Sequence, residues 1–394
     1  MENFMKLAKL WLLCVLTSAV FGWTSLTTAI ANDQQFSSAY QPYVEQGDMP
    51  GAVLIVATPT EIVSEETVGW ADVAQRTPIR TDSVFWIASN SKAIVAAAVM
   101  ICVEEGKLDL DAPIENYLPQ LKDLKIARPQ EDGSVLLTPV SKKPTLRQAL
   151  SHTAGFRFIT PLQERYGIDV LQVQRLASLV GVTPLIDEPG ARYSYSNLGI
   201  DMGQAAVEAV VGKPFEEFLQ ERILDPLEMN ETTFFPNDEL RARFVTPYAW
   251  DREKNALKPI RFLQNPSIDD GSPRYAEGGG GLFSTPRDLI KFFQMLGGKG
   301  VGANGVRILS EESVATIASK QTGDALADNY GFGVVVNDVW YGHGGAYGTQ
   351  GVVYRDGGLA AVYMVAVSGL PKQGEAERVF RNRLDEIARE RAGK

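Results

Sequence analysis

The most restrictive feature of this sequence is the stretch from Lys92 to Val103, which consists almost entirely of Ala, Ile, Val, Met and Cys. Glu104-Glu105-Gly106 follows it, and a glycine just beyond the last turn is a typical helix end. A helix that is apolar on every side has no face to present to water, so it must lie inside a domain. The chain of 394 residues is long enough to build a core around it.

Strand-like segments lie towards both ends of the chain. Ala52–Ala57 and Glu61–Val68 are rich in β-branched residues and are separated by the turn-like Thr58-Pro59-Thr60. Near the other end the candidate strands are Tyr330–Val336, Gly351–Tyr354 and Leu359–Val367, followed by an amphipathic helix from about Glu375 to Ala392. Asp356-Gly357-Gly358 is a typical hairpin turn between the last two strands.

The middle of the chain, from about 110 to 275, has the pattern of helices and long loops, and its clearest helix runs from Pro214 to Ile223. Strands at both ends with helices between them predict an α+β fold. We expect one antiparallel β-sheet, flanked by helices and formed from both chain termini, with a mainly α-helical insertion. The α/β part would span about 36–108 and 278–394, and the helical part about 109–277.

The first 31 residues have the pattern of a signal peptide. Lys6 and Lys9 precede an apolar stretch from Leu10 to Gly22, and Ala29-Ile30-Ala31 is a small-x-small cleavage pattern. We therefore expect cleavage near Ala31, a folded domain at 32–394 and a periplasmic or secreted protein. A retained membrane anchor is the alternative. No stable membrane insertion is expected, because the apolar run is shorter than the roughly 20 residues of a spanning helix.

Scarce residue types limit the chemistry. The chain has two histidines, His152 and His343, and two cysteines, Cys14 and Cys102. This excludes a histidine-rich metal centre and a disulfide framework, so we expect no metal and no cofactor. The formal net charge of −10 argues against nucleic acid as a partner. Cys102 is expected to be a buried thiol that packs as a small hydrophobe.

A Ser-x-x-Lys motif, Ser89-Asn90-Ser91-Lys92, occurs where the strand-like Val84–Ala88 gives way to the apolar helix. Ser89 would lie at a helix N-terminus with free backbone N–H groups, and Lys92 would lie one turn along the same face. A lysine held in apolar surroundings has a lowered pKa and can take a proton from serine. The alternative is a lysine that extends from the first turn to the surface.

Two further segments carry suitable groups. Tyr193-Ser194-Tyr195-Ser196-Asn197 offers the Tyr195 phenol, which can relay a proton if a nearby cation lowers its pKa, and the Asn197 amide. Gly342-His343-Gly344-Gly345-Ala346 has the glycines that let a substrate pair along an edge strand. Taken alone, the first segment is more typical of simple packing, and the second of a glycine-rich hairpin.

Together, Ser-x-x-Lys, Tyr-x-Asn and His-x-Gly in this order resemble the serine hydrolases related to class C β-lactamases, D-alanyl-D-alanine carboxypeptidases and EstB-like esterases. The resemblance covers about residues 40 to 370. It extends to the segments Thr145–Gly155, Asp225–Met229 and Gly279–Thr285. It implies a β-lactamase/transpeptidase-like fold.

The resemblance also implies roles for individual residues. Ser89 would be the acylated nucleophile, Lys92 its base and Tyr195 the proton relay. The backbone N–H groups of Ser89 and Ala346 would form the oxyanion hole. Substrate-binding residues would be Asn197, His343, Gly344 and Gly345, whereas His152 would belong to the framework. Many relatives have lysine where this chain has His343, and a neutral imidazole offers no fixed charge to a substrate carboxylate.

The function expected from the sequence is therefore an exported serine hydrolase that forms an acyl-enzyme with ester or amide bonds. Its partner would be a small-molecule ester, amide, β-lactam or D-amino-acid peptide, and the choice among these stays open. The alternative is a sensor that β-lactams or peptidoglycan acylate without appreciable turnover. Both readings predict that Ser89 lies within hydrogen-bond reach of Lys92, with Tyr195 and the strand at His343 beside them.

Overall fold

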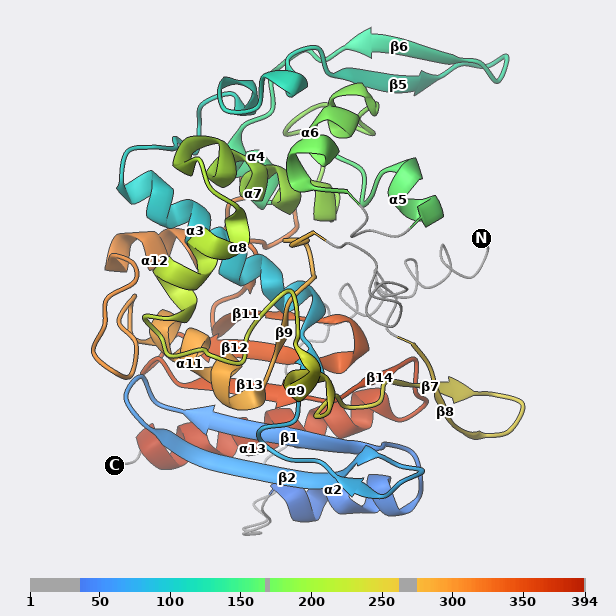
Figure 1. The fold of residues 1–394 in the computed structure, drawn as a ribbon, viewed down its shortest axis with the longest axis vertical. Helices are drawn as coiled ribbons and strands as arrows, with labels where there is room; N and C mark the ends of the chain where they lie inside the picture. Colours follow the sequence, from blue (N-terminus) through green and yellow to red (C-terminus); the bar gives the residue numbers. More distant parts are fainter. Residues whose placement is uncertain (1–35, 167–170, 262–274, 393–394) are drawn as a thin grey trace. The chain divides into compact units, whose positions relative to one another are not determined.

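The computed structural model describes residues 36–166, 171–261 and 275–392 (Figure 1). The expected signal peptide at 1–31 lies outside these residues. Both ends of the described chain contribute to one antiparallel sheet of seven strands, in the order β10-β11-β12-β13-β1-β2-β3. Its strands are β1 (Gly51–Ala57), β2 (Ile62–Asp72), β3 (Thr77–Pro78), β10 (Val335–Val336), β11 (Trp340–Gly344), β12 (Gln350–Tyr354) and β13 (Ala360–Met364).

The two ends of the chain meet at the pairing of β1 with β13. Its register runs from Val53 opposite Met364 to Ala57 opposite Ala360. Every residue of β1 is buried, as expected for a central strand covered on both faces. The prediction of one sheet built from both termini is confirmed.

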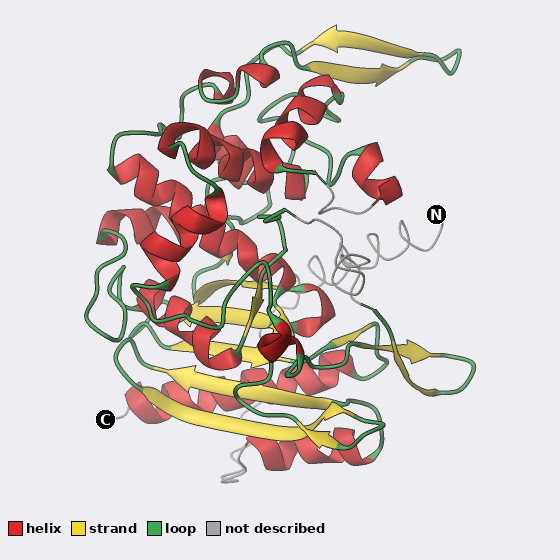
Figure 2. Ribbon diagram, in the orientation of Figure 1, coloured by secondary structure: helices red, strands yellow, loops and turns green. Residues whose placement is uncertain are grey.

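Helices cover both faces of the sheet (Figure 2). On one face, α2 (Phe36–Glu45) and α13 (Gln373–Ala392) pack against alternate strand residues such as Leu54 and Tyr363. On the other face, α11 (Pro286–Gly297) packs against β1, β12 and β13. Because side chains alternate along a strand, β1 contributes Leu54 to one core and Val53 to the other.

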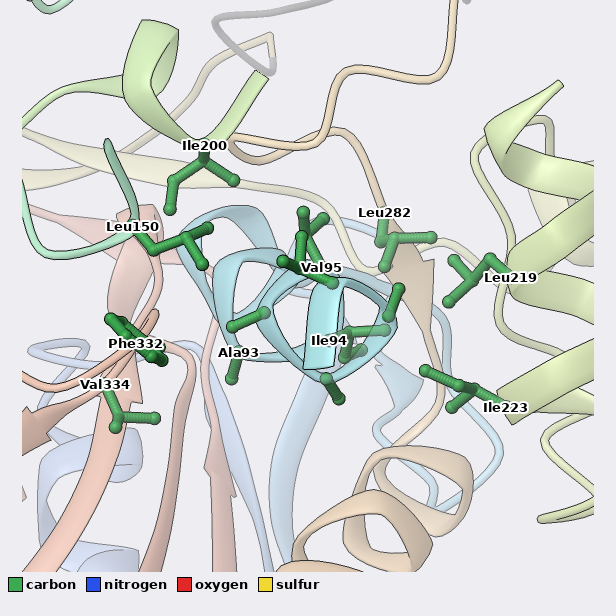
Figure 3. Packing of buried hydrophobic residues seen from close by; sticks show 14 of the residues in the cluster. Ala93, Ile94, Val95, Leu150, Ile200, Leu219, Ile223, Leu282, Phe332 and Val334 are labelled. Carbon is green, nitrogen blue, oxygen red and sulfur yellow. The ribbon is translucent and has the colours of Figure 1, made fainter. Parts of the chain in front are cut away.

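The apolar segment forms helix α3 (Ser91–Glu104), in which every residue from Ser91 to Cys102 is buried. Figure 3 shows its side chains surrounded by apolar residues from other elements, among them Leu150, Ile200, Leu219 and Phe332. Cys102 is a free, buried thiol whose pKa burial raises to about 11. The expectation of a buried central helix is therefore confirmed.

The segment between the two parts of the sheet contains more helix than strand, and its other described residues form turns and loops. Its helices are α4 (Leu146–Leu150), α5 (Pro161–Tyr166), α6 (Val173–Val182), α7 (Asn197–Val211), α8 (Phe215–Leu219) and α9 (Asp238–Arg241). It also holds two hairpins, β5 (Lys125–Pro129) with β6 (Val135–Pro139), and β7 (Tyr248–Asp251) with β8 (Ala256–Pro259). Short elements elsewhere are β4 (Phe85–Trp86), β9 (Phe283–Ser284), β14 (Val367–Ser368) and α12 (Glu311–Ile317).

Two expected elements are shorter than predicted. Of the expected strand Tyr330–Val336, only β10 forms. The expected helix Pro214–Ile223 is α8 followed by a π-helical turn at Gln220–Leu224, with Pro214 as the N-cap. Across 36–166, 171–261 and 275–392, no helix has the length and apolar character needed to cross a bilayer.

Candidate active site

Ser89 lies in a tight turn between β4 and the buried helix α3. The turn is a single 3₁₀ segment, Ala88–Asn90, and Ala88 has a φ of +47°, which is rare for a residue with a side chain. The hydroxyl of Ser91 holds the turn by donating to the carbonyl of Ala88 at 2.7 Å. Ser89 itself is half-buried. The turn therefore presents its hydroxyl at the start of a helix, where backbone N–H groups lack helical partners.

Lys92 is completely buried, and three acceptors surround its amine. Nζ donates to Asn197 Oδ1 at 2.7 Å, to the carbonyl of Gly279, and to Ser89 Oγ at 3.2 Å. The expected contact of Ser89 with Lys92 is confirmed, and the alternative of a lysine reaching the surface is wrong. Carbonyl oxygens only accept, so Asn197 and Gly279 occupy two of the N–H groups. In the neutral amine, the lone pair is then directed at Ser89.

Burial lowers the pKa of Lys92 from its ordinary value, because the charged form loses its hydration. Two carboxylates, Glu277 and Asp201, oppose this by favouring the charged form. The amine can therefore lose its proton more readily than an exposed lysine, which is the property required of a base acting on serine.

Tyr195 lies against both residues. Its hydroxyl is hydrogen-bonded to Ser89, and its ring centroid is 4.7 Å from Nζ of Lys92. A relay role was predicted for this phenol if a nearby cation lowered its pKa, but burial raises that pKa instead. Tyr195 is therefore a neutral phenol, which can relay a proton only by accepting one as it gives one up.

His343 contacts Tyr195 from strand β11. Its Nδ1 lies 2.6 Å from the carbonyl of Gly344, and because a carbonyl only accepts, Nδ1 carries the hydrogen. Burial lowers the pKa of the imidazole to about 3, so the ring is neutral near pH 7. Nε2 is then an acceptor, 3.4 Å from the Tyr195 hydroxyl. When Lys92 is charged, its Nζ donates to Ser89, Ser89 donates to Tyr195 and Tyr195 donates to Nε2 of His343, so the hydrogen bonds run in one direction.

The segment after β11 packs directly on the Ser89 turn. A Cβ atom on Gly345 would lie 2.3 Å from the carbonyl oxygen of Ile87, so the two backbones approach more closely than any side chain allows. Thr349 Oγ1 donates to the same carbonyl at 3.1 Å, and Asn90 Nδ2 donates to Thr349 Oγ1 at 3.1 Å. These contacts hold Ala346 beside the Ser89 turn.

The outer edge of β11 is only partly covered. Strand β10 pairs with Tyr341 and Gly342 and then ends. Gly344 and Ala346 beyond it are partly exposed, whereas His343 is buried. This part of the strand edge is therefore accessible, and pairing of a substrate backbone along it stays a prediction.

The ring of His152 packs against the ring of Tyr195. It is buried, its Nδ1 accepts from the backbone N–H of Ser196 at 3.2 Å, and its ring centroid lies 4.6 Å from that of Tyr195. Burial also lowers its pKa, which keeps the ring neutral. These contacts agree with the framework role expected for His152.

Glu277, Asp201 and Tyr330 are also buried in this site, and they are not among the site residues predicted from the sequence. Tyr330 packs 4.6 Å from His152, measured between ring centroids. Glu277 stands next to the glycine run that begins at Gly278, and an acidic residue there was the one available signal. In the described ranges, no group of three or more His, Cys, Asp or Glu side chains is arranged to hold a metal ion.

Comparison with known proteins agrees with this geometry. The Beta-lactamase family model matches residues 36–385. Protein Rv1367c of Mycobacterium tuberculosis is 30% identical over 291 residues, which cover 71% of this chain and 70% of that protein. Lovastatin esterase of Penicillium rubens is 30% identical over 277 residues, covering 66% of this chain and 67% of that protein.

A solved structure supports the fold. Unliganded simvastatin synthase from Aspergillus terreus superposes with a TM-score of 0.74 at 21% identity, covering 88% of this chain and 96% of that chain. The family match spans the sheet, the helical part and the Ser89 turn. The chain belongs to the β-lactamase family of serine hydrolases.

Proposed function

We propose that the protein is an exported serine hydrolase that forms an acyl-enzyme on Ser89 and transfers the acyl group from an ester or amide to water. The observation that carries the proposal is the buried amine of Lys92, which donates to two carbonyl oxygens and turns its third direction to Ser89. A buried lysine fixed in this way has no evident purpose in packing alone.

In the acylation step, Ser89 Oγ attacks the carbonyl carbon of the substrate while its proton passes to the neutral amine of Lys92. The backbone N–H groups of Ser89 and Ala346 hold the oxyanion that develops. When the tetrahedral intermediate collapses, the bond to the leaving group breaks, and the proton reaches that group from Lys92 through Tyr195. Removing one such oxyanion donor costs about 3 to 4 kcal/mol in other acyl-transfer enzymes.

In the deacylation step, a water molecule attacks the ester carbonyl of the acyl-enzyme. Tyr195 accepts a proton from this water and gives its own proton to Ser89 Oγ, to which its hydroxyl is hydrogen-bonded. Ser89 Oγ then leaves as the protonated hydroxyl. The neutral state of His343 supports this role, since its Nε2 accepts from Tyr195.

The substrate class proposed first is a neutral ester or amide. A β-lactam or a D-alanyl peptide carries a carboxylate, and the neutral imidazole of His343 offers that group no fixed positive charge. The name of the relative lovastatin esterase supports the same class. We also propose a periplasmic or secreted location, which the sequence of residues 1–31 supports.

The test compares the wild-type protein with Ser89→Ala on a p-nitrophenyl ester series, nitrocefin and a D-Ala-D-Ala peptide. We expect ester hydrolysis to give the highest kcat/KM, and Ser89→Ala to lose at least about 10³-fold of it, because the nucleophile is gone. Ser134→Ala, in the exposed hairpin turn after β5, is the matched control and should retain full activity. Full activity of a folded Ser89→Ala protein would refute the proposal.

The same assay separates a hydrolase from an acylatable sensor. A hydrolase releases p-nitrophenol continuously after any initial burst. A sensor releases one equivalent per protein and stops, because its acyl-enzyme does not react with water. If every substrate gave a burst without turnover, Ser89 would still be the acylated residue. The protein would then be a sensor and not a hydrolase.

A further inference from the structure

Two buried carboxylates lie next to the acceptors of Lys92. Asp201, in helix α7, is 0% exposed, and Glu277, just before the glycine run, is 1% exposed. An ionised carboxylate in such a place is costly unless it is paired. Neither side chain lies in the motifs of the proposed mechanism, so that mechanism does not explain why both are buried here.

Glu277 fixes the orientation of the Asn197 amide. Its Oε1 accepts from Asn197 Nδ2 at 3.1 Å, while Oδ1 of the same amide accepts from Lys92 at 2.7 Å. An amide turned by 180° would direct its N–H groups at the lysine and its oxygen at the carboxylate. Both contacts would then be repulsive, so the carboxylate selects the orientation that Lys92 requires.

Asp201 holds the second acceptor. Its Oδ1 accepts from the backbone N–H of Gly279 at 3.1 Å, and the carbonyl of Gly279 accepts from Lys92. Only glycine fits at 279, because a Cβ atom there would lie 2.4 Å from Glu277 Oε1 and 2.6 Å from Asn197 Cγ. One carboxylate therefore stands behind each of the two carbonyl oxygens that hold the lysine.

We infer that Glu277, with Asp201, is a positioning residue for Lys92, which fixes the two acceptors so that the remaining direction of Nζ faces Ser89. The inference rests on the proposed function of Ser89 and Lys92. Glu277 acts through Asn197, so its removal should weaken the base without removing the nucleophile.

The charges around Lys92 determine how the pKa of its amine should respond to replacement of Glu277. The titratable groups that face the amine are Glu277, Asp201, Tyr195, His152 and His343. Burial keeps the tyrosine and both histidines uncharged near pH 7. The carboxylates are the groups in this set that favour the charged lysine. Replacing Glu277 by a neutral residue should therefore lower the pKa of Lys92.

The experiment measures kcat/KM against pH for Glu277→Gln, with an ester that has no ionisable group. The acid limb of the wild-type profile reports loss of the proton from Lys92 in the free enzyme. We expect this limb to move about one pH unit towards acid and the plateau to fall about tenfold, as the lysine loses a neighbouring charge and a fixed acceptor. Glu277→Asp keeps the charge and should keep the limb near its wild-type position.

Controls separate this inference from the proposed function. Glu65→Gln removes an exposed carboxylate that pairs with Arg287 and should leave the profile unchanged. If Glu277→Gln does not fold, Asp201→Asn should move the limb in the same direction. A limb that stays at the wild-type pH in a folded variant overturns the positioning role, even where the plateau falls. Failure of the proposed function is a different result, namely an active Ser89→Ala protein.

Discussion

The residue that most distinguishes this site is His343. Its Nδ1–H donates to Gly344, which leaves Nε2 as an acceptor for Tyr195. A lysine at this position would donate to the phenol and place a positive charge beside it. The chemistry of the third motif is therefore inverted, from a cation that donates to a neutral ring that accepts.

We predict that His343→Lys raises kcat/KM for a carboxylate-bearing β-lactam relative to a neutral ester by about tenfold or more, because a charged hydrogen bond is worth about 1.5–3 kcal/mol. The measurement is the ratio of nitrocefin to p-nitrophenyl acetate hydrolysis. His343→Gln is the control, since glutamine adds no charge and should not raise the ratio.

An unchanged ratio in a folded His343→Lys protein would show that the substrate carboxylate is bound elsewhere.

The importance of position 343 and its chemical consequence could be predicted from the sequence alone. The sequence could not predict the tautomer, which depends on the path of the backbone at Gly344, or the raised pKa of Tyr195, which depends on how deeply the ring is buried.

The position of helix α7 matters most for the site, because the first turn of this helix carries Asn197. Ser196 caps the helix by accepting from the N–H of Gly199 at 3.0 Å. A Cβ atom on Gly199 would lie 2.5 Å from the carbonyl oxygen of Ala149 in α4, so the two helices are in backbone contact. The contact between α4 and α7 sets where the Asn197 amide meets Lys92.

We predict that Gly199→Ala lowers the free energy of unfolding by about 1–3 kcal/mol, because the added methyl forces α7 away from α4. This loss is opposite in sign to the gain of roughly 0.5–1 kcal/mol that Gly→Ala gives in an unhindered helix. Urea unfolding measures the change, and kcat/KM should fall with it as Asn197 moves.

The control for this prediction is Gly374→Ala in α13, where a Cβ atom meets nothing within 4 Å. Its stability should stay the same or increase. Equal effects of the two substitutions would contradict the proposed contact between α4 and α7.

The elements differ in how far the sequence predicts them. The runs of β1, β2, β12 and β13 were predicted correctly because β-branched residues favour strands, and α3 was predicted correctly because burial on every side leaves a uniformly apolar helix. Strand β11 was expected only as part of the third motif, because its glycines have low strand propensity and the sheet imposes their conformation. Glu277 escaped prediction because its role depends on a loop that returns to α3 from far along the chain.

For the whole molecule, the scarcity of histidine has a second consequence. Both histidines of the chain, His152 and His343, are buried in the site, and burial lowers the pKa of each. In the unfolded chain both regain an ordinary pKa near 6.5. The folded state therefore binds fewer protons than the unfolded state over a range of acidic pH, and acid should destabilise it.

The direction of this pH dependence, and the pH range in which it occurs, follow from the pKa of His343. Its folded pKa is about 3 and its ordinary value 6.5. Its contribution to stability is complete above pH 6.5 and is lost as the pH falls towards 3, at about 1.4 kcal/mol per pH unit. Asp201 acts in the opposite sense, because burial raises its pKa and the folded state holds its proton more tightly.

We predict that His343→Gln removes one proton from this acid dependence while leaving the contributions of His152 and Asp201 in place. Between pH 6 and 4, the free energy of unfolding of the wild-type protein should fall more steeply than that of the variant, by about 1.4 kcal/mol per pH unit. Urea unfolding at closely spaced pH values, followed by tryptophan fluorescence, measures both slopes. If the free energy of unfolding varied with pH equally in both proteins, His343 would already be protonated in the folded state. Its Nε2 could then not accept a hydrogen bond from Tyr195.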